Sequence, residues 1–446
     1  MLTQPTITDV LTQGACKLSR LDDVIQTSEK KENFIPYVNV QPWSSLTLSH
    51  GLPGLIVLFS EMDHFFPGSG WDQKARQSIG ALVDEIDHKG ISNVTLYSGL
   101  TGICFAIYLA SKEGSRYQSL LSALESSLIH AVKTEYIEPI QKQLREGRPC
   151  SSLHYDAITG INGVLSYLLL RQDNASATLI TKDLLQLLVN MTYPIYWKKR
   201  ITPGWIIDPQ DLMLQAERES YTNGCFDTGL AHGVSGTLSI LSKANLQGIQ
   251  VDGQLQAIRS ISDWLIDTQC TVGEVKMVWP GRFTFDAEEK NACKCNSEFY
   301  RDGWCYGAPG IACSLFAAAS ALNEQSLATN ALSLMHEACD RYVSKKNLTC
   351  PSFCHGLAGL LTMLHQMYLA TKSKKLKTTF ELVLNDILAK YDESLPFGFK
   401  SEASIPHDEI IEIDNAGLLD GTTGTLLALT FVSSDTPRPW LSLFLI

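Results

Sequence analysis

The sequence predicts an all-α fold of the α/α-toroid class, a double ring of seven inner and seven outer helices. Three observations predict it. A Gly-x-x-Gly motif recurs seven times, an almost wholly apolar stretch follows each copy, and an amphipathic stretch lies between successive copies. A repeat of this kind cannot bury its apolar helix alone, so neighbouring repeats must cover it. Closure into a ring leaves no inner helix without a neighbour.

The motifs mark the same corner of each repeat. Their first glycines are Gly51, Gly99, Gly160, Gly233, Gly307, Gly356 and Gly421. Because glycine has no Cβ, the motif permits a tight turn and a close approach between helices. No copy reads as a P-loop, and none follows the strand that a dinucleotide-binding loop requires. We therefore expect the residues just before these glycines to share one rim of the molecule.

The stretches on either side of the motifs predict the helices. Residues 102–110, 163–170, 310–322 and 424–431 are apolar almost all round, which is typical of buried helices. The stretches between the motifs carry charges on one face and predict outer helices. These lie near residues 5–25, 71–88, 116–138, 176–192, 253–269, 324–344 and 374–391.

Two segments interrupt the pattern, residues 193–224 (the first insertion) and residues 271–304 (the second insertion). Both are rich in Pro, Gly and aromatic residues, which predicts small extended insertions at the rim. Each insertion leads directly into a repeat that carries candidate metal-binding or titratable residues. Long connections of this kind are often binding loops, although a loop without a binding role is the alternative. No linker is evident, so residues 1–446 are expected to form a single domain.

Composition restricts the function. The chain is 45% hydrophobic and 19% charged, and its net charge of −11 argues against nucleic acid as a partner. No stretch is long and apolar enough to predict a membrane span, and no signal region is evident. Twelve cysteines in such a chain predict reduced thiols, so we expect a cytoplasmic protein.

Cys305 and Cys354 occupy the same place in two neighbouring repeats, two positions before the first glycine, and His355 follows Cys354. Thiol and imidazole are groups that zinc prefers, and three protein ligands with one open position are typical of catalytic zinc. A single Cys-His pair is more often a packing feature. The second cysteine at an equivalent place therefore favours one zinc ion per chain.

His232 and Asp156 are candidates for proton transfer. A histidine near its ordinary pKa of about 6.5 exchanges protons at cellular pH, although a histidine bonded to a backbone carbonyl is the equal alternative. Asp156 can orient a histidine, or it can cap a helix. His50 has the corresponding place in the first repeat and is expected to be structural or to contact substrate.

Arg301 can pair with Asp156 or with a substrate carboxyl group, or it can be an ordinary rim residue. Cys293 and Cys295 form a rival metal cluster with Cys305, but the sequence supplies no third partner and no histidine at a usual spacing from the Cys-x-Cys pair.

With these motifs the chain resembles the lanthionine synthetase C family of lantibiotic cyclases. The most specific matches are residues 301–310, which read Arg-Asp-Gly-Trp-Cys-Tyr-Gly-Ala-Pro-Gly, and residues 354–359, which read Cys-His-Gly-Leu-Ala-Gly. Further matches are residues 48–54, 97–102, 155–160 and 224–233. The resemblance spans nearly the whole chain. It implies an α/α toroid with one zinc ion.

The resemblance also implies roles for individual residues. Cys305, Cys354 and His355 would bind the zinc ion, and His232 would handle the proton with support from Asp156. Trp304 and Tyr306, with Arg301, match family positions near the site.

The activity that the resemblance implies is thioether ring formation in a peptide. A cysteine thiol would add to dehydroalanine or dehydrobutyrine in a dehydrated precursor peptide that carries a leader. A dehydratase and an export transporter of the same pathway are the expected partners, and a complex with them would hold the protein peripherally at the membrane.

Three alternatives remain at this stage. Eukaryotic relatives associated with glutathione share these motifs and imply glutathione addition to dehydrated residues. A zinc-stabilised peptide-binding scaffold would need zinc only to fold. An α/α-toroid glycosidase would need a pair of carboxylates, for which Asp156 is the only good candidate.

Overall fold

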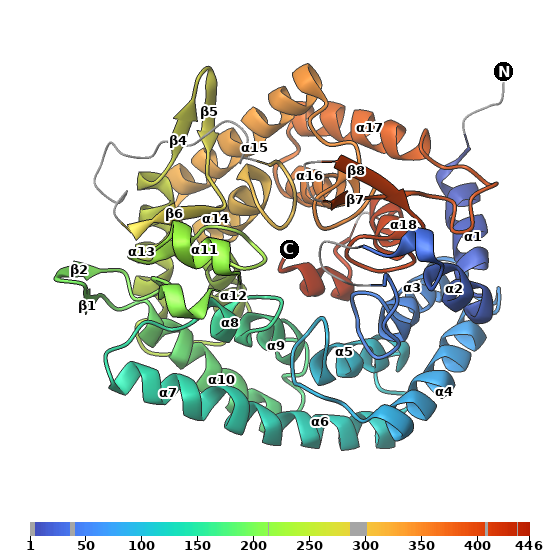
Figure 1. Ribbon diagram of the computed structural model, residues 1–446, viewed down its shortest axis with the longest axis horizontal. Coiled ribbons are helices and arrows are strands. Elements are labelled where there is room, and N and C mark those ends of the chain that lie inside the picture. The colour runs from blue at the N-terminus through green and yellow to red at the C-terminus, as the bar shows by residue number, and fades with distance from the viewer. Residues whose placement is uncertain (1–4, 36–40, 213, 286–300, 406–408, 435) are drawn as a thin grey trace. The chain divides into compact units, whose positions relative to one another are not determined.

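The computed structural model describes residues 5–35, 41–212, 214–285, 301–405, 409–434 and 436–446 (Figure 1). The chain divides into two compact units. Unit 1 comprises Met1–Asn93, Tyr97–Glu125 and Tyr342–Trp440, and unit 2 comprises Val94–Leu96, Ser126–Arg341 and Leu441–Ile446. Inner and outer helices alternate along the chain in both units, and the strands form short pairs.

Seven inner helices begin directly after the first glycine of a motif, as predicted. They are α3 (Leu52–Phe65), α5 (Leu100–Ala110), α9 (Ile161–Leu168), α12 (Val234–Leu246), α14 (Ala308–Leu322), α16 (Leu357–Thr371) and α18 (Thr422–Val432). Most of their residues are buried, and every residue of α9 is. Since such helices have no polar face, packing against neighbours on several sides is what stabilises them.

The outer helices also lie where the amphipathic stretches predict them. They are α1 (Ile7–Leu18), α2 (Leu21–Ser28), α4 (Trp71–Lys89), α6 (Gln118–Val132), α10 (Ala175–Met191), α13 (Gln254–Asp267), α15 (Gln325–Lys345) and α17 (Lys374–Leu388). In α4, Trp71, Ala75, Ile79 and Leu82 are buried. Their spacing of three or four residues places them on one face of the helix.

Two of the predicted outer helices have different boundaries in the structure. The stretch near residues 5–25 forms two helices, because Arg20 leaves the helical conformation at φ −94° and ψ 80°. The stretch near residues 116–138 extends beyond its predicted end. After α6 it passes through the π-helical turn Lys133–Ile137 into α7 (Glu138–Arg145). Pro139 lies at the start of α7, where its missing N–H does least harm.

Inner helices pack against outer helices and against one another within each unit (Figure 1). In unit 1, α3 packs against α4, α5 and α18, while α16 packs against α17 and α18. In unit 2, α12 packs against α9, α13 and α14. The apolar inner helices thus form the core of each unit.

The second glycine of the motif permits a close backbone contact. A Cβ on Gly424 would lie 2.0 Å from the carbonyl oxygen of Leu418, and one on Gly163 would lie 2.3 Å from that of Ala157. No real side chain tolerates such distances. The loop before each of these motifs therefore packs directly on the first turn of its inner helix.

The two insertions contain the short strands that the sequence predicts. In the first, β1 (Ile195–Trp197) and β2 (Arg200–Thr202) form a hairpin, which η3 (Pro209–Asp211) and α11 (Gln215–Ser220) follow. Immediately after this insertion, β3 (Cys225–Asp227) pairs with β6 (Arg282–Thr284) of the second insertion, so the two segments are joined. A further hairpin consists of β4 (Cys270–Val272) and β5 (Val275–Val278).

The hairpin of β7 (Ser401–Ile405) and β8 (Glu409–Ile413) precedes the last inner helix and was not predicted. Its strands are five residues long, and the helical repeat pattern indicates no element at these residues. The hairpin belongs to unit 1, like the outer helix α17 before it and the inner helix α18 after it.

Nine cysteines of the described residues form no disulfide bond. Cys293 and Cys295, the rival metal cluster, lie outside the described residues. In the part of the chain that the structure describes, no helix combines the length and the hydropathy needed to span a bilayer.

Candidate functional site

The loops that precede the inner helices are joined edge to edge by backbone hydrogen bonds within each unit. In unit 1, Cys354 N–H donates to Leu419 O over 2.8 Å, Leu418 N–H donates to Ser49 O over 2.7 Å, and Ser49 N–H donates to Tyr97 O over 3.1 Å. These bonds link the sixth, seventh, first and second repeats. The residues just before the glycines of these four repeats therefore share one edge of unit 1, as the repeat pattern predicts.

Unit 2 repeats the arrangement in the third, fourth and fifth repeats. Ala157 N–H donates to Ala231 O over 2.8 Å, and Ala231 N–H donates to Cys305 O over 3.3 Å. The loops that carry Asp156, His232 and Cys305 are therefore direct neighbours within unit 2.

Unit 1 brings together on this edge three side chains of the types that bind metal ions. One ligand atom each from Cys354, His355 and Asp420 lies within 4.8 Å of the others, and all three residues are partly exposed. His355 Nδ1 is 3.3 Å from Asp420 Oδ1. Thiolate, imidazole and carboxylate are the donors that zinc takes in proteins. Asp420 Oδ1 is buried and accepts no hydrogen bond from any described residue.

His50, from the first repeat, faces the same carboxylate. Its Nε2 lies 3.9 Å from Asp420 Oδ2. Burial lowers the pKa of His50, and the nearby negative charge of Asp420 only partly opposes this effect. His50 therefore lies at the edge of this cluster in unit 1.

Unit 2 brings His232 and Asp156 together. His232 Nδ1 is 2.7 Å from Asp156 Oδ2, and Asp156 is completely buried. The other carboxylate oxygen, Oδ1, accepts from the backbone N–H groups of Thr159 and Gly160 at 2.6 and 2.9 Å. Asp156 thus has both of the interactions that its sequence position suggested, with the histidine and with the backbone before α9.

The environment of His232 favours its protonated form. Burial of the imidazole disfavours the charge, but the hydrogen bond to Asp156 and the negative charges of Asp156 and Asp227 outweigh burial and raise the pKa of His232. Because Asp156 engages Nδ1, Nε2 is the ring nitrogen left for a substrate.

Tyr306 packs against His232 and is fixed from its other end. The two rings stack with their centroids 6.2 Å apart, and the Tyr306 hydroxyl donates to Asp227 Oδ2 over 2.9 Å. Burial, together with the charge of Asp227, raises the pKa of Tyr306 well above its usual range, so the phenol remains protonated. Tyr306 is therefore a neutral ring that packs against His232 and is held in position through its hydroxyl group.

Asp227 receives its compensating charge from the second insertion. Its carboxylate is completely buried, and Arg282 Nε donates to Oδ2 over 3.1 Å. Arg282 also pairs with Glu217 of α11 in the first insertion. The pairing of β3 with β6 places Asp227 directly opposite Arg282. The two insertions thus hold the Tyr306 hydroxyl in place.

The remaining predicted residues lie on the loop before α14. Trp304 is completely buried, and its Nε1–H donates to Phe444 O over 2.7 Å, so it anchors the loop in the core. Arg301 is exposed, and no ion pair joins it to Asp156 in the described structure. Cys305 is partly exposed and belongs to unit 2, whereas Cys354 and His355 belong to unit 1.

Sequence analysis gave no role to Asp420 or Asp227. Asp420 stands immediately before the first glycine of its repeat, the same place as His355, His232 and His50. That alignment was a usable signal. Asp227 lies farther from its motif, and only the pairing of β3 with β6 reveals its partners.

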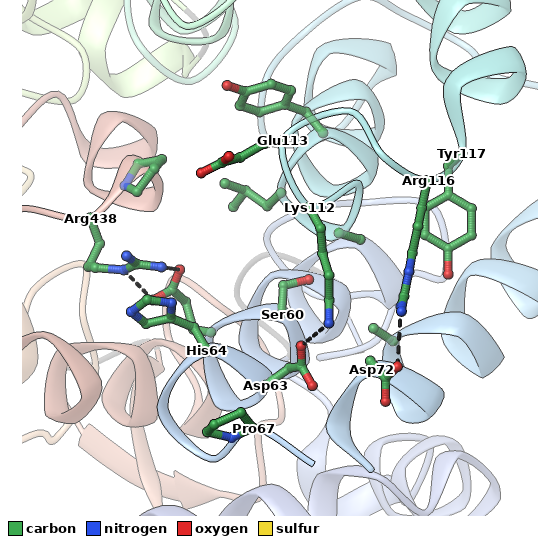
Figure 2. Close-up of a pocket in the computed structure, with 16 residues that line it drawn as sticks. Ser60, Asp63, His64, Pro67, Asp72, Lys112, Glu113, Arg116, Tyr117 and Arg438 are labelled. Carbon is green, nitrogen blue, oxygen red and sulfur yellow. Dashed lines mark hydrogen bonds and ion pairs between the residues drawn. The ribbon is translucent and has the colours of Figure 1, made fainter. Parts of the chain in front are cut away.

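A pocket of about 520 Å³ lies at the other end of the inner helices of unit 1 (Figure 2). It is lined by the last residues of α3 and α5, and by Arg438. Each lysine and arginine of the lining is paired: Arg438 with Glu61, Lys112 with Asp63, and Arg116 with Asp72. Since α3 begins beside His50 and rises about 1.5 Å per residue, the pocket is roughly 20 Å from the metal-type cluster. The pocket is therefore separate from that cluster.

A family model described as "Lanthionine synthetase C-like protein" matches residues 42–445. The match covers all seven motifs and both groups of side chains described above.

One similar protein is the nisin biosynthesis protein NisC of Lactococcus lactis subsp. lactis. It is 27% identical over 409 residues, which are 91% of this chain and 88% of that protein. A solved structure named nisin cyclase superposes with a TM-score of 0.76 at 23% identity, and the match covers 97% of each chain. This similarity shows a shared fold, and with the family match it confirms the predicted all-α, α/α-toroid fold class.

Proposed function

The chain belongs to the lanthionine synthetase C-like protein family, and we propose from this premise that it is a zinc-dependent lantibiotic cyclase. It would join a cysteine thiol of a dehydrated precursor peptide to dehydroalanine or dehydrobutyrine of the same peptide. The product would be a lanthionine or methyllanthionine thioether ring. The similarity to the nisin biosynthesis protein and to nisin cyclase supports cyclase activity.

The observation that carries this proposal is the group of sulfur, nitrogen and oxygen donors in unit 1. Cys354 and His355 have the chemistry to hold zinc, and a buried carboxylate oxygen without a hydrogen bond lies beside them. Cys305 is proposed as a further ligand because of its equivalent place in its own repeat. When bound, zinc lowers the pKa of a coordinated thiol, so that the thiol is a thiolate at neutral pH.

His232 would supply the proton that completes the addition. As the C–S bond forms at Cβ, the electrons of the Cα=Cβ bond move toward Cα and the adjoining carbonyl. His232 Nε2–H then protonates Cα, while Asp156 holds Nδ1 and stabilises the imidazolium. The thiol loses one proton and Cα gains one, so the addition has no net change in protons. It needs no oxidant or reductant.

The other residues of unit 2 would shape the space around His232. Tyr306 would restrict the imidazole to one face, because Asp227 and Arg282 anchor its hydroxyl. Trp304 would support the loop from the core. Arg301 is exposed and would contact the peptide.

The proposed partner is a dehydrated precursor peptide with its leader. A dehydratase would supply this substrate, and an export transporter would remove the product. A complex with these partners would hold the enzyme on the cytoplasmic side of the membrane, at its periphery.

Incubation with a dehydrated, leader-bearing peptide tests the proposal. Ring closure protects peptide thiols from alkylation, which mass spectrometry measures. We expect protection with the wild type, and a rate about 10² to 10⁴ times lower with His232→Gln at unchanged zinc content. A glutathione adduct in place of a ring would indicate the glutathione-adding alternative. A folded, zinc-loaded protein that forms neither product would favour the scaffold.

A further inference from the structure

The pocket at the far end of the inner helices of unit 1 takes no part in the proposed reaction. We propose that this pocket binds a small organic cation, an ammonium or guanidinium group on a short carbon chain, and that Glu113 is the anionic partner of this cation. The inference goes beyond the proposed cyclase activity, because the pocket is separate from the metal-type cluster (Figure 2).

The size and the walls of the pocket suit a small molecule. Its volume of about 520 Å³ lies within the usual range of ligand sites, which is roughly 300 to 1,000 Å³. Ala75, Leu109 and the rings of Tyr108 and Tyr117 are part of its lining. A carbon chain can pack against these groups, and aromatic rings attract cations.

The ion pairs of the lining leave one carboxylate without a partner. Glu61, Asp63 and Asp72 pair with basic side chains at 3.0, 2.6 and 3.2 Å. The Glu113 carboxylate has no ion pair and no hydrogen bond with any described residue. Since every lysine and arginine of the lining is already paired, the unbalanced charge of the pocket is negative, counting His64 as neutral. A cation is therefore the ligand that would balance it.

The ends of two inner helices favour the same sign of charge. α3 ends at Phe65 and α5 ends at Ala110, and residues from the last turns of both helices line the pocket. The C-terminal end of an α-helix carries a partial negative charge, which stabilises a cation placed near it. The two helix ends thus act in the same direction as Glu113.

The backbone holds Glu113 in an unfavourable conformation at the pocket. Lys112 and Glu113 have φ values of 50° and 56°, and consecutive left-handed residues with a Cβ are rare. The ion pairs of Lys112 with Asp63 and of Arg116 with Asp72 fix the segment on either side of Glu113. Figure 2 shows the Glu113 carboxylate pointing away from Lys112 and Arg116. Residues in such conformations are frequent at ligand-binding sites.

The rival explanation is that Glu113 is an ordinary exposed glutamate and that the pocket holds only solvent. A specific site differs in two measurable ways. It prefers a cation over a neutral molecule of similar shape, and it loses this preference when the carboxylate is replaced by an amide.

Titration of the full chain, followed by saturation-transfer NMR of the ligand, tests the proposal with butylammonium and with neutral butan-1-ol. We expect saturable binding of butylammonium, and binding of the alcohol at least about tenfold weaker, because a hydrogen bond to a charged group is lost. Glu113→Gln preserves the shape of the side chain and should weaken butylammonium binding at least about tenfold for the same reason. The matched control is Glu29→Gln, an exposed glutamate of unit 1 outside the lining, which should leave the affinity unchanged.

Equal affinity of butylammonium for the wild type and for Glu113→Gln would overturn the proposal, as would equal binding of the alcohol or no saturable binding to the wild type. A further titration with Nα-acetyl-lysine amide identifies the source of the cation. Binding as tight as that of butylammonium indicates a lysine side chain of a peptide, and much weaker binding indicates a free small amine. The titrations need neither zinc nor a precursor peptide, so a negative result would leave the proposed cyclase activity untouched.

Discussion

Unit 2 contains three completely buried aspartates that each pair with a basic side chain. They are Asp156, Asp227 and Asp302. Their partners are His232, Arg282 and Arg341. Burying a carboxylate is strongly unfavourable unless a partner compensates its charge. Each pair therefore fixes the loop before one inner helix, and the first two position residues that we propose for catalysis.

The pair of His232 and Asp156 predicts a measurable pKa. In metal-free wild-type protein, the pKa of His232 should lie above its ordinary value of about 6.5, because the charge and hydrogen bond of Asp156 outweigh burial. Asp156→Asn should lower this pKa. Since the folded-state pKa is raised, the stability from this pair is fully present below pH 6.5 and lost as pH rises through the folded-state value. Titration of the imidazole by NMR measures both values, and an identical pKa in the variant would refute the assignment.

The ion pair of Arg341 with Asp302 is expected to stabilise the loop that carries Cys305. Its guanidinium donates to Asp302 at 2.8 and 2.7 Å, and both side chains are buried. Arg341→Met should reduce the free energy of unfolding by about 3 to 5 kcal/mol, because it leaves the Asp302 charge uncompensated. The control Arg148→Met, which removes an exposed pair with Glu146, should change it by less than about 1 kcal/mol. Urea denaturation provides both numbers, and equal effects would contradict the argument.

At the scale of the elements, the repeating unit is a loop, a Gly-x-x-Gly turn and an inner helix. The glycines let the loop lie on the helix, and backbone hydrogen bonds join neighbouring loops within each unit. The side chains just before the glycines are therefore held by two constraints, one from their own helix and one from the adjacent repeat. The insertions add a third constraint through β3 and β6.

The close contact at Gly424 predicts the effect of adding one methyl group. Gly424→Ala should destabilise the protein by about 1 to 3 kcal/mol, because the new Cβ would meet Leu418 O. The matched control is Gly80→Ala in the exposed part of α4, where a Cβ meets nothing within 4 Å. That substitution should stabilise the helix by about 0.5 to 1 kcal/mol. Thermal unfolding distinguishes the two, and destabilisation by both would remove the close-contact explanation.

The anchoring of Tyr306 predicts a catalytic effect from the second insertion. Arg282→Met should leave Asp227 without its cation and release the Tyr306 hydroxyl. We expect cyclisation to slow between about tenfold and a hundredfold, since small displacements at a reacting group have effects of this size. Zinc content should not change. Lys199→Met, in the turn between β1 and β2, should retain the wild-type rate. A normal rate for Arg282→Met would show that the anchor is not needed.

At the scale of the whole molecule, sequence reasoning located both kinds of helix because their signals are local. Each inner helix starts at a glycine, and each outer helix has a periodic apolar face. The break at Arg20 and the hairpin of β7 and β8 were missed, since a few residues carry little periodicity. Asp227 and Asp420 were missed for another reason. The partners of Asp227 come from another segment, which spacing along one sequence does not reveal, whereas Asp420 stands at the place before the first glycine that His355, His232 and His50 also occupy, and comparison of the repeats could have found it.

The most direct test of the zinc-dependent cyclase measures metal content and ring formation on the same samples of wild type and Cys354→Ala. We expect about one zinc ion per wild-type chain, as in other catalytic zinc sites. We expect almost none in the variant, together with loss of ring formation and a retained helical circular dichroism spectrum. A variant that keeps its zinc ion and still closes rings would show that Cys354 neither binds the ion nor supports the reaction.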